Sequence, residues 1–270
     1  MKPVKMIVCD LDGTLLYNTK KITDRNIRAI RAARKQGIKF GICSGRSAVA
    51  LKTMLKVWGI DQDVDFVIGF NGAMVMDPET GKIEETFWMR PGDIEPLIES
   101  LKNSGLTLAE YHGDTLYATK DNLLVRQMSR RNKLNFEVVS EKQLLRDSLK
   151  FMAVGMPWSI SRYLNSDKPA MLKTARVFRS GPFLLEFVHP ELSKLQGVKT
   201  MCERYGFSTD EAVSFGNDNN DLEMLAGTIG VAMANALPRV KEAASYVTAS
   251  NRKDGVAVFL EKYVLKTAGE

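Results

Sequence analysis

The stretch that decides the fold is Met6-Ile7-Val8-Cys9-Asp10-Leu11-Asp12-Gly13-Thr14-Leu15, close to the start of the chain. Its first four residues are apolar, which predicts a strand that is buried on both faces. Residues two apart in an extended segment point the same way, so Asp10 and Asp12 are expected to face one site at the C-terminal edge of a sheet. Two solvated aspartates in a plain turn are the alternative, and the strand before them and Gly13-Thr14 after them argue against it.

Two carboxylates this close repel each other unless a cation lies between them or one of them holds a proton. Mg²⁺ prefers hard oxygen ligands, so it is the cation that this pattern favours. The chain has only two histidines, His112 and His189, and neither lies in a metal-ligand pattern. Acid–base chemistry at this site is therefore expected to fall to carboxylates.

The segments that follow alternate between helical and strand patterns. In order they are a helix capped by Thr23 that ends at Gly37, a strand over 38–42, a helix over 48–58 that ends at Gly59, and a strand over 66–68. This βαβαβ order predicts a Rossmann-like α/β core with a doubly wound parallel sheet.

The pattern changes after Asn71-Gly72 and changes back near Pro190. Between these points, residues 82–187 mix helical and β-like runs, which predicts an inserted α+β domain. From Pro190 onward, strand and helix patterns alternate again, with strands expected over 212–215 and 229–233. Residues 1–81 and 188–270 are therefore expected to form one core, and 82–187 a separate domain inserted into it.

Composition excludes some classes of protein and leaves others open. The chain of 270 residues is 44% hydrophobic and 26% charged, as expected for a globular protein with a real core. It has no apolar run of about 18 residues and no apolar leader, so we expect a cytoplasmic protein with no membrane partner. The net charge of +6 could indicate nucleic acid, but the 38 Lys and Arg residues are spread along the chain. An anionic small substrate suits this charge, and no nucleic-acid partner is expected.

Four motifs in this order resemble the haloacid dehalogenase superfamily. They are the D-x-D-G-T segment at Asp10, Ser44-Gly45-Arg46 after the second strand, Lys194 at the start of a helix, and Gly216-Asn217-Asp218-Asn219-Asn220-Asp221 after a later strand. Three further segments resemble the subgroup with a large cap that is often called Cof-type or type IIB: Asn71-Gly72-Ala73, 230–236 and 254–257. The resemblance covers nearly the whole chain and implies that residues 82–187 are that subgroup's cap.

The resemblance implies a role for each matching residue. Asp10 would be the nucleophile that forms an aspartyl-phosphate, and Asp12 would protonate the leaving oxygen and then deprotonate water. Lys194 would pair with both Asp10 and the phosphoryl group. Mg²⁺ would be held by the Asp10 carboxylate, the Asp12 carbonyl and Asn217.

The substrate would be bound by residues that, taken alone, are typical of turns: Ser44, Gly45, Asn71 and Gly72. Only their place in the order of motifs indicates that they bind substrate. Arg46 is expected to have a structural role rather than a catalytic one.

One position departs from the family's pattern. Where the family has Gly-Asp, this chain has Gly216-Asn217, so either Asn217 ligates the metal or Asp218 shifts into its place. We favour Asn217 as the ligand, with Asp218, Asn220 and Asp221 beside it or as alternative ligands.

The expected function is Mg²⁺-dependent hydrolysis of phosphate monoesters of small metabolites, such as sugar phosphates or phosphorylated cofactors. A phosphotransferase or mutase of the same fold is one alternative. A regulatory or binding protein is the other, and the uncharged Asn217 is the feature in its favour.

Overall fold

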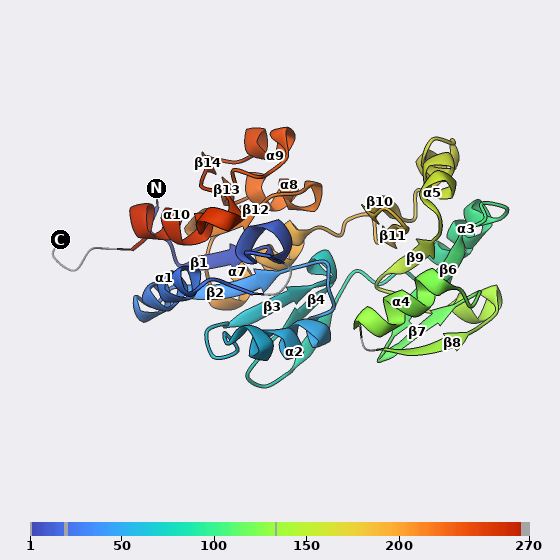
Figure 1. Cartoon of the computed structure of the whole chain (residues 1–270), viewed down its shortest axis with the longest axis horizontal. Helices are drawn as coiled ribbons and strands as arrows, with labels where there is room; N and C mark the ends of the chain where they lie inside the picture. The colour runs from blue at the N-terminus through green and yellow to red at the C-terminus, as the bar shows by residue number, and fades with distance from the viewer. Residues whose placement is uncertain (1, 19–20, 133, 266–270) are drawn as a thin grey trace. The chain divides into compact units, whose positions relative to one another are not determined.

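The computed structural model describes residues 2–18, 21–132 and 134–265, and its chain divides into two compact units (Figure 1). The core unit comprises Met1–Glu84 and Ser193–Glu270, and the inserted unit comprises Glu85–Leu192. The expected boundaries at 81 and 187 lie three and five residues earlier than these divisions at 84 and 192. The difference arises because the sheet of the core unit takes in the strand over Ile83–Glu85, and the sheet of the inserted unit takes in Val188.

The core unit is built on one eight-stranded sheet in the order β14-β13-β12-β1-β2-β3-β4-β5. Its strands are β1 (Met6–Cys9), β2 (Lys39–Cys43), β3 (Phe66–Gly69), β4 (Met74–Met76), β5 (Ile83–Glu85), β12 (Ala212–Gly216), β13 (Ile229–Ala232) and β14 (Tyr246–Val247). The strands from β14 to β3 run parallel, and β4 is antiparallel to β3. The predicted strand at Met6–Cys9 is the fully buried β1 between β12 and β2.

Helices cover both faces of this sheet, as a doubly wound fold requires. They are α1 (Asp24–Lys35), α2 (Ala48–Trp58), α7 (Lys194–Tyr205), α8 (Leu222–Ala226), α9 (Pro238–Ala243) and α10 (Gly255–Tyr263). On one face, Val198 of α7 packs in a buried cluster with Met6 and Val8 of β1. On the other face, Phe259 of α10 meets Phe215 edge-on at 5.5 Å between ring centroids. The predicted α/β class of the core is therefore confirmed.

Local capping chemistry sets where the first helices begin and end. The Thr23 hydroxyl accepts the Asn26 N–H at 3.3 Å, and the Ser47 hydroxyl accepts the Ala50 N–H at 3.2 Å, so each helix begins on a satisfied cap. Gly59, with φ of +68°, ends α2 in the left-handed conformation that a residue without Cβ adopts readily. The predicted start of α1 after Thr23 and the predicted end of α2 at Gly59 are confirmed.

The inserted unit has a sheet of its own, in the order β10-β11-β9-β6-β7-β8, that is antiparallel except between β7 and β8. The strands are β6 (Thr107–His112), β7 (Thr115–Ala118), β8 (Asn135–Val138), β9 (Phe151–Val154), β10 (Arg176–Gly181) and β11 (Leu184–Val188). The helices are α3 (Pro91–Leu101), α4 (Leu123–Asn132), α5 (Pro157–Leu164) and α6 (Lys168–Met171). The predicted α+β character of the insertion is confirmed.

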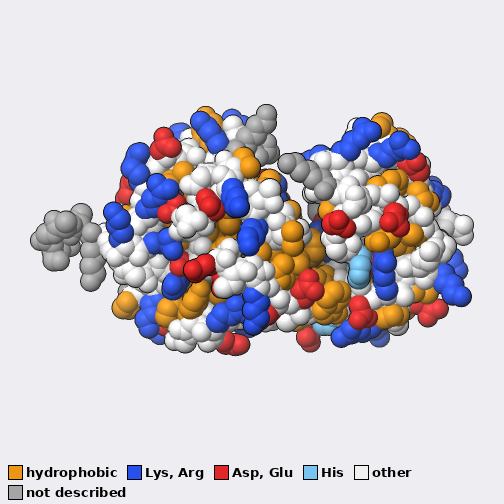
Figure 2. All heavy atoms as spheres, turned by 90° about the horizontal axis from the view of Figure 1, so that it is seen from below, with side chains coloured by type: hydrophobic (Ala, Val, Ile, Leu, Met, Phe, Trp, Pro, Cys, Tyr) orange, Lys and Arg blue, Asp and Glu red, His pale blue; other side chains and the backbone are white. Residues whose placement is uncertain are grey.

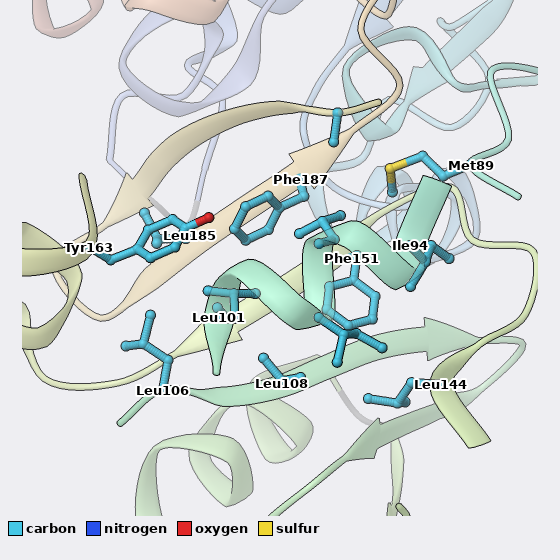
Figure 3. Packing of buried hydrophobic residues seen from close by; sticks show 14 of the residues in the cluster. Met89, Ile94, Leu101, Leu106, Leu108, Leu144, Phe151, Tyr163, Leu185 and Phe187 are labelled. Carbon is cyan, nitrogen blue, oxygen red and sulfur yellow. The ribbon is translucent and has the colours of Figure 1, made fainter. Parts of the chain in front are cut away.

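The core of the inserted unit forms where α3 packs on one face of this sheet (Figure 3). Ile94 and Leu101, seven residues apart, lie on one face of α3. They pack in a buried cluster with Leu108, Phe151 and Leu185 from three neighbouring strands. Alternation along each strand sends every second side chain into this cluster, so the unit has an apolar core independent of the core unit.

Charged side chains do not gather into a patch of one sign on the face that Figure 2 draws. On the face that Figure 2 draws, Lys and Arg side chains are scattered among acidic, polar and apolar ones. Across the described ranges, no helix combines the length and the apolar character that crossing a bilayer demands.

Asp65 lies just before β3, and its carboxylate links the start of β3 to the start of β2 and to the last turn of α1. Its carboxylate accepts hydrogen bonds from Arg34 Nε at 3.0 Å, Lys39 Nζ at 3.2 Å and the Phe40 N–H at 2.9 Å. Burial raises the pKa of Asp65, but the bonds from Arg34 and the Phe40 N–H outweigh burial, and the pKa lies below its usual range.

We expect Asp65→Asn to lower the free energy of unfolding by about 1–2 kcal/mol at pH 7, because charge-assisted hydrogen bonds are lost. A depressed folded-state pKa stabilises the protein above the unfolded pKa, about 3.9 for Asp, and this stabilisation is lost as the pH falls through the folded value. Urea unfolding should therefore show a gap between wild type and variant that is full at pH 7 and narrows below about pH 4. Asp61→Asn, in the same loop, is the matched control, and an equal loss there would contradict this account of Asp65.

Candidate functional site

The site forms where β1 ends and the chain makes a wide turn over Leu11–Leu15. The Asp10 N–H donates to Phe215 O at 3.0 Å, so Asp10 is still anchored to the sheet. The N–H of Leu15 then donates to Asp10 O at 3.2 Å and closes the turn. Gly13, at φ of +86°, takes the left-handed conformation that the turn needs.

Asp10 and Lys194 meet in the interior although 184 residues separate them in sequence. Lys194 is the first residue of α7 and is fully buried, and its Nζ lies 2.7 Å from Asp10 Oδ1 and 2.7 Å from Asp221 Oδ1. Burial by itself lowers the pKa of Lys194, but the charges of Asp10 and Asp221 outweigh it and raise the pKa, so the ammonium stays charged. One buried cation therefore bridges two buried carboxylates.

Asp10 itself lies in an environment that disfavours its charge. Burial is the largest influence on its pKa, and together with the nearby Asp221 charge it raises the pKa to about 7 against the opposing effect of Lys194. A cation beside the second oxygen of the Asp10 carboxylate would favour the charged form.

Asp221 serves the turn after β12 as well as Lys194. Its Oδ2 accepts the N–H of Asn217 at 2.8 Å and the N–H of Asp218 at 3.0 Å, while its Oδ1 accepts from Lys194. Both oxygens are thus engaged, which fits a supporting position better than a metal-ligand position. Asp218 is exposed and its Oδ1 accepts the N–H of Asn219 at 2.6 Å.

The side-chain amide of Asn217 points between Asp10 and Asp12. Its inward atom lies 2.9 Å from Asp12 O, 3.2 Å from Asp10 Oδ2 and 2.7 Å from Thr14 Oγ1. With the amide oxygen inward, three oxygens from a carboxylate, a main-chain carbonyl and an amide face one another without a proton between them. Such a group needs a positive partner.

This donor set fits Mg²⁺. Neighbouring ligands of an octahedral Mg²⁺ lie about 2.9 Å apart when its bonds are about 2.0–2.1 Å long, close to the separations of 2.9 and 3.2 Å found here. Within residues 2–18, 21–132 and 134–265, no three His, Cys, Asp or Glu side chains converge as a metal site would require. The candidate cation site is of a different composition, because a carbonyl and an amide supply two of its three oxygens.

The Asp12 carboxylate points elsewhere than the sequence pattern suggests. It is exposed and forms a two-pronged ion pair with Arg46, with Nη2 at 2.8 Å from Oδ1 and Nε at 3.2 Å from Oδ2. Strand alternation predicts that it lies beside the Asp10 carboxylate. Because the strand ends at Cys9 and the chain then turns, only the carbonyl of Asp12 joins Asp10 at Asn217.

The residues expected to bind substrate lie together at the ends of β2 and β3. The Asn71 N–H donates to Ser44 O at 2.9 Å, and Asn71 Oδ1 accepts from Asn220 Nδ2 at 3.1 Å. Gly45 lies so close to Asn71 that a Cβ there would stand 3.3 Å from its Oδ1. Gly72, with φ of +114°, lies against the Ser193 carbonyl, only 2.3 Å from where a Cβ would be.

Arg46, for which a structural role is expected, pairs directly with Asp12. Two other side chains at this site were not expected from the sequence. Thr14 bonds the Asn217 amide, and Asn235 Nδ2 donates to Gly13 O at 2.8 Å. Arg46 and Thr14 sit inside the motifs quoted above, which was an available signal, whereas Asn235 had none beyond its place in the 230–236 segment.

A pocket of about 680 Å³ opens beside Asp12 and Gly13. Its other walls come from Leu16, Tyr17, Asn18, Asn235, Ser250, Asn251 and Arg252. The core unit by itself therefore leaves space next to the exposed carboxylate of Asp12.

A doubly wound α/β sheet with a buried Asp–Lys–Asp triad and an oxygen cluster at its strand ends is suited to an enzyme that acts on phosphate groups. Sequence comparison then places the protein within that class. The chain belongs to the haloacid dehalogenase-like hydrolases, whose family profile matches residues 7–260.

Individual relatives agree with this assignment. The chain is 30% identical over 269 residues to “Putative phosphatase YxeH” of Bacillus subtilis (strain 168), with 97% of this chain and 98% of that protein covered. It is 28% identical over 268 residues to the 5-amino-6-(5-phospho-D-ribitylamino)uracil phosphatase YitU of the same strain, with 96% and 97% covered. The solved structure of the subclass IIB sugar phosphatase BT4131 matches with a TM-score of 0.82 at 23% identity, covering 97% of this chain and 100% of that one, and this likeness shows the fold. The expected membership of the haloacid dehalogenase superfamily is confirmed.

Proposed function

We propose that this protein is a Mg²⁺-dependent phosphatase that hydrolyses phosphate monoesters of small metabolites through an aspartyl-phosphate on Asp10. The observation that carries the proposal is the position of the Asp10 carboxylate, with one oxygen 2.7 Å from Lys194 Nζ and the other 3.2 Å from the inward atom of Asn217. A buried carboxylate between a lysine and a cation site is suited to attack phosphorus, because positive charge lies on both sides of the reacting group.

In the first step, an oxygen of Asp10 attacks the phosphorus atom and the bond from phosphorus to the ester oxygen breaks. Asp12, after it has left its ion pair with Arg46 and taken up a proton from solvent, gives that proton to the leaving oxygen, which departs as an alcohol. Asp12 is exposed, so solvent and substrate can reach its carboxylate, and its ion pair with Arg46 must open before it acts as an acid.

In the second step, Asp12 takes a proton from water, and the water oxygen attacks phosphorus. The bond between Asp10 and phosphorus breaks, inorganic phosphate leaves, and both aspartates return to their starting protonation. Asp12 therefore acts as an acid and then as a base, as expected for a chain with few histidines.

Several groups on the core unit would bind the phosphoryl oxygens. Lys194 supplies a fixed positive charge at the start of α7, where the free N–H groups and the helix dipole also favour an anion. Ser44 and Asn71, joined by the Asn71 N–H bond to Ser44 O, would add hydrogen bonds, with Gly45 and Gly72 allowing the backbone to come close.

The metal would be held by Asp10 Oδ2, Asp12 O and the Asn217 amide oxygen. When bound, Mg²⁺ supplies positive charge that offsets the repulsion between the Asp10 carboxylate and the phosphoryl oxygens. Asp221 would support this group by holding the Asn217 backbone and Lys194, with Asp218 and Asn220 beside it.

Two observations guide the choice of substrates. YitU is named for the 5-phosphate of a ribitylaminouracil, a small phosphorylated polyol attached to a heterocycle. The net charge of +6 also suits an anionic small molecule. We therefore propose phosphorylated sugars, sugar alcohols and nucleobase derivatives as the class of substrate.

The test is a screen of phosphorylated metabolites for released inorganic phosphate, with Mg²⁺ and with EDTA. We expect release from at least one sugar or polyol phosphate that requires Mg²⁺, and no transfer of phosphate to an added sugar. Transfer to the sugar in place of release would indicate a phosphotransferase, and full release in EDTA would remove the metal from the proposal.

Asp12→Asn should lower kcat by roughly 10²–10⁴-fold, since general acid–base catalysis contributes about that much. The variant should unfold like the wild type in urea, because the Asp12 carboxylate is exposed. Asp24→Asn, at an exposed aspartate of α1 outside the site, is the matched control and should keep kcat within about threefold. Equal losses in the two variants would contradict the role of Asp12.

A further inference from the structure

We propose that Asn217 is a switch: its side-chain amide turns its nitrogen toward Asp10 and Asp12 when the site holds no cation, and turns its oxygen inward when Mg²⁺ binds. The inference rests on the proposed function, since it concerns the same cation site. It goes further in assigning this chain's asparagine a second state that the family's usual aspartate does not have.

The contacts of the amide favour the nitrogen-inward state without a cation. The inward atom faces two acceptors, Asp12 O and Asp10 Oδ2, and the Thr14 hydroxyl, which can donate or accept, and the outward atom faces only donors. With nitrogen inward, the amide donates to Asp12 O at 2.9 Å and lies 3.2 Å from Asp10 Oδ2 and 2.7 Å from Thr14 Oγ1. An amide NH₂ carries two protons, so it satisfies two of these three oxygens, and the Thr14 hydroxyl can turn its own proton elsewhere.

A bound cation requires the other state. An amide nitrogen is a donor only and offers no electron pair to Mg²⁺, whereas the amide oxygen does. Metal binding must therefore break the bonds from the NH₂ group and rotate the amide by half a turn.

The surroundings hold the Asn217 backbone in place and set a glycine against its amide. The Asn217 N–H donates to Asp221 Oδ2 at 2.8 Å, which holds the backbone from which the side chain rotates. Gly13 lies against the amide, and a Cβ there would stand 2.7 and 3.0 Å from its two terminal atoms. A side chain at residue 13 would therefore clash with the amide in either orientation, and glycine avoids that clash.

Asparagine at position 217 therefore stabilises the site both with and without a cation, whereas aspartate would stabilise it only with one. The NH₂ group replaces the cation when none is bound, so the metal-free site is satisfied. An aspartate would present oxygen in both orientations and would add a second negative charge beside Asp10, which favours the cation but destabilises the site without one. Compared with asparagine, aspartate at position 217 should raise the Mg²⁺ affinity and lower the stability of the protein without metal.

The first experiment compares Asn217→Asp with wild type in Mg²⁺ titration calorimetry and in thermal unfolding. We expect the variant to bind Mg²⁺ at least about tenfold more tightly, and its Tm in EDTA to fall by about 2–4 °C. Asn219→Asp places the same charge two residues away in the same turn and should change the Mg²⁺ affinity less than about twofold. An Asn217→Asp variant that binds Mg²⁺ no more tightly than wild type would overturn the switch.

The second experiment observes the amide directly. The ¹⁵N side-chain signals of Asn217 are those that vanish in Asn217→Asp, and they can be followed during Mg²⁺ titration of the wild type. We expect the NH₂ protons to exchange with water slowly in EDTA, and at a rate that rises with Mg²⁺ occupancy. Mg²⁺ binding with unchanged amide signals overturns the switch alone, whereas no Mg²⁺ binding to wild type overturns the proposed metal site as well.

Discussion

Asp10→Asn is expected to abolish phosphate release, with kcat lower by roughly 10⁴-fold or more, because an amide cannot attack phosphorus as a carboxylate does. The fold should persist. Lys194 keeps its 2.7 Å contact with Asp221, and removing one of two buried carboxylates also removes their mutual repulsion. We therefore expect the free energy of unfolding to change by less than about 2 kcal/mol.

The measurement is steady-state phosphate release with the best substrate of the screen, together with urea unfolding of the same preparations. Asp24→Asn, on the exposed surface of α1, makes the same chemical change away from the site and should leave kcat unaltered. If Asp10→Asn keeps near-normal Mg²⁺-dependent turnover while folded, Asp10 is not the nucleophile.

Lys194→Met should be the most damaging single substitution for stability as well as a severe one for turnover. It leaves Asp10 and Asp221 buried side by side without their cation. Breaking a buried ion pair by removing one partner costs about 3–5 kcal/mol, so we expect a loss of that size in the free energy of unfolding. Turnover should fall at least about a hundredfold, since a fixed charge on the phosphoryl group is lost.

Two further variants separate the causes. Lys199→Met replaces an exposed lysine of the same helix and should change neither quantity appreciably. Lys194→Met combined with Asp221→Asn removes one of the stranded charges, so it should be more stable than Lys194→Met alone while staying inactive. If the double variant is the less stable of the two, the bridging lysine is not what keeps these carboxylates buried.

The two variants test different properties of the site. Asp10→Asn tests chemistry at nearly constant stability, whereas Lys194→Met tests the electrostatic support on which both stability and chemistry depend. Agreement with the first and failure of the second would leave the nucleophile in place but would assign the burial of Asp10 to other contacts.

Much of the core unit was predictable because its signals are local. The apolar run Met6–Cys9 needs burial on both faces, so it predicts a central strand wherever the rest of the chain lies. Thr23, Ser47 and Gly59 act on N–H and C=O groups within four residues of themselves, so helix ends can be read from sequence. The boundaries of the inserted unit were less accurate, because the edge pairing that takes Ile83–Glu85 into the core sheet depends on contacts with distant strands.

Some features of the site were likewise predictable from the sequence, and others were not. The motif order pointed to Asp10, Lys194 and Asn217, and the structure places Lys194 beside one oxygen of the Asp10 carboxylate and Asn217 beside the other. The direction of the Asp12 carboxylate was not predictable, because it depends on where the strand ends and on Arg46, which lies 34 residues away. The second state of Asn217 was likewise hidden, since the sequence shows an amide but not what its two ends face.

The sequence by itself determined the alternation of strands and helices, the caps, and the set of polar residues that follow each strand, because these depend on neighbours within a few positions. Only the tertiary structure decided which of those polar groups touch: Lys194 between Asp10 and Asp221, Arg46 on Asp12, and the Asn217 amide against two oxygens. The physical reason is that hydrogen bonds and close ion pairs form over a few ångströms of space, and parallel strands bring residues as distant in sequence as Thr14 and Asn217, which are 203 positions apart, to one sheet edge.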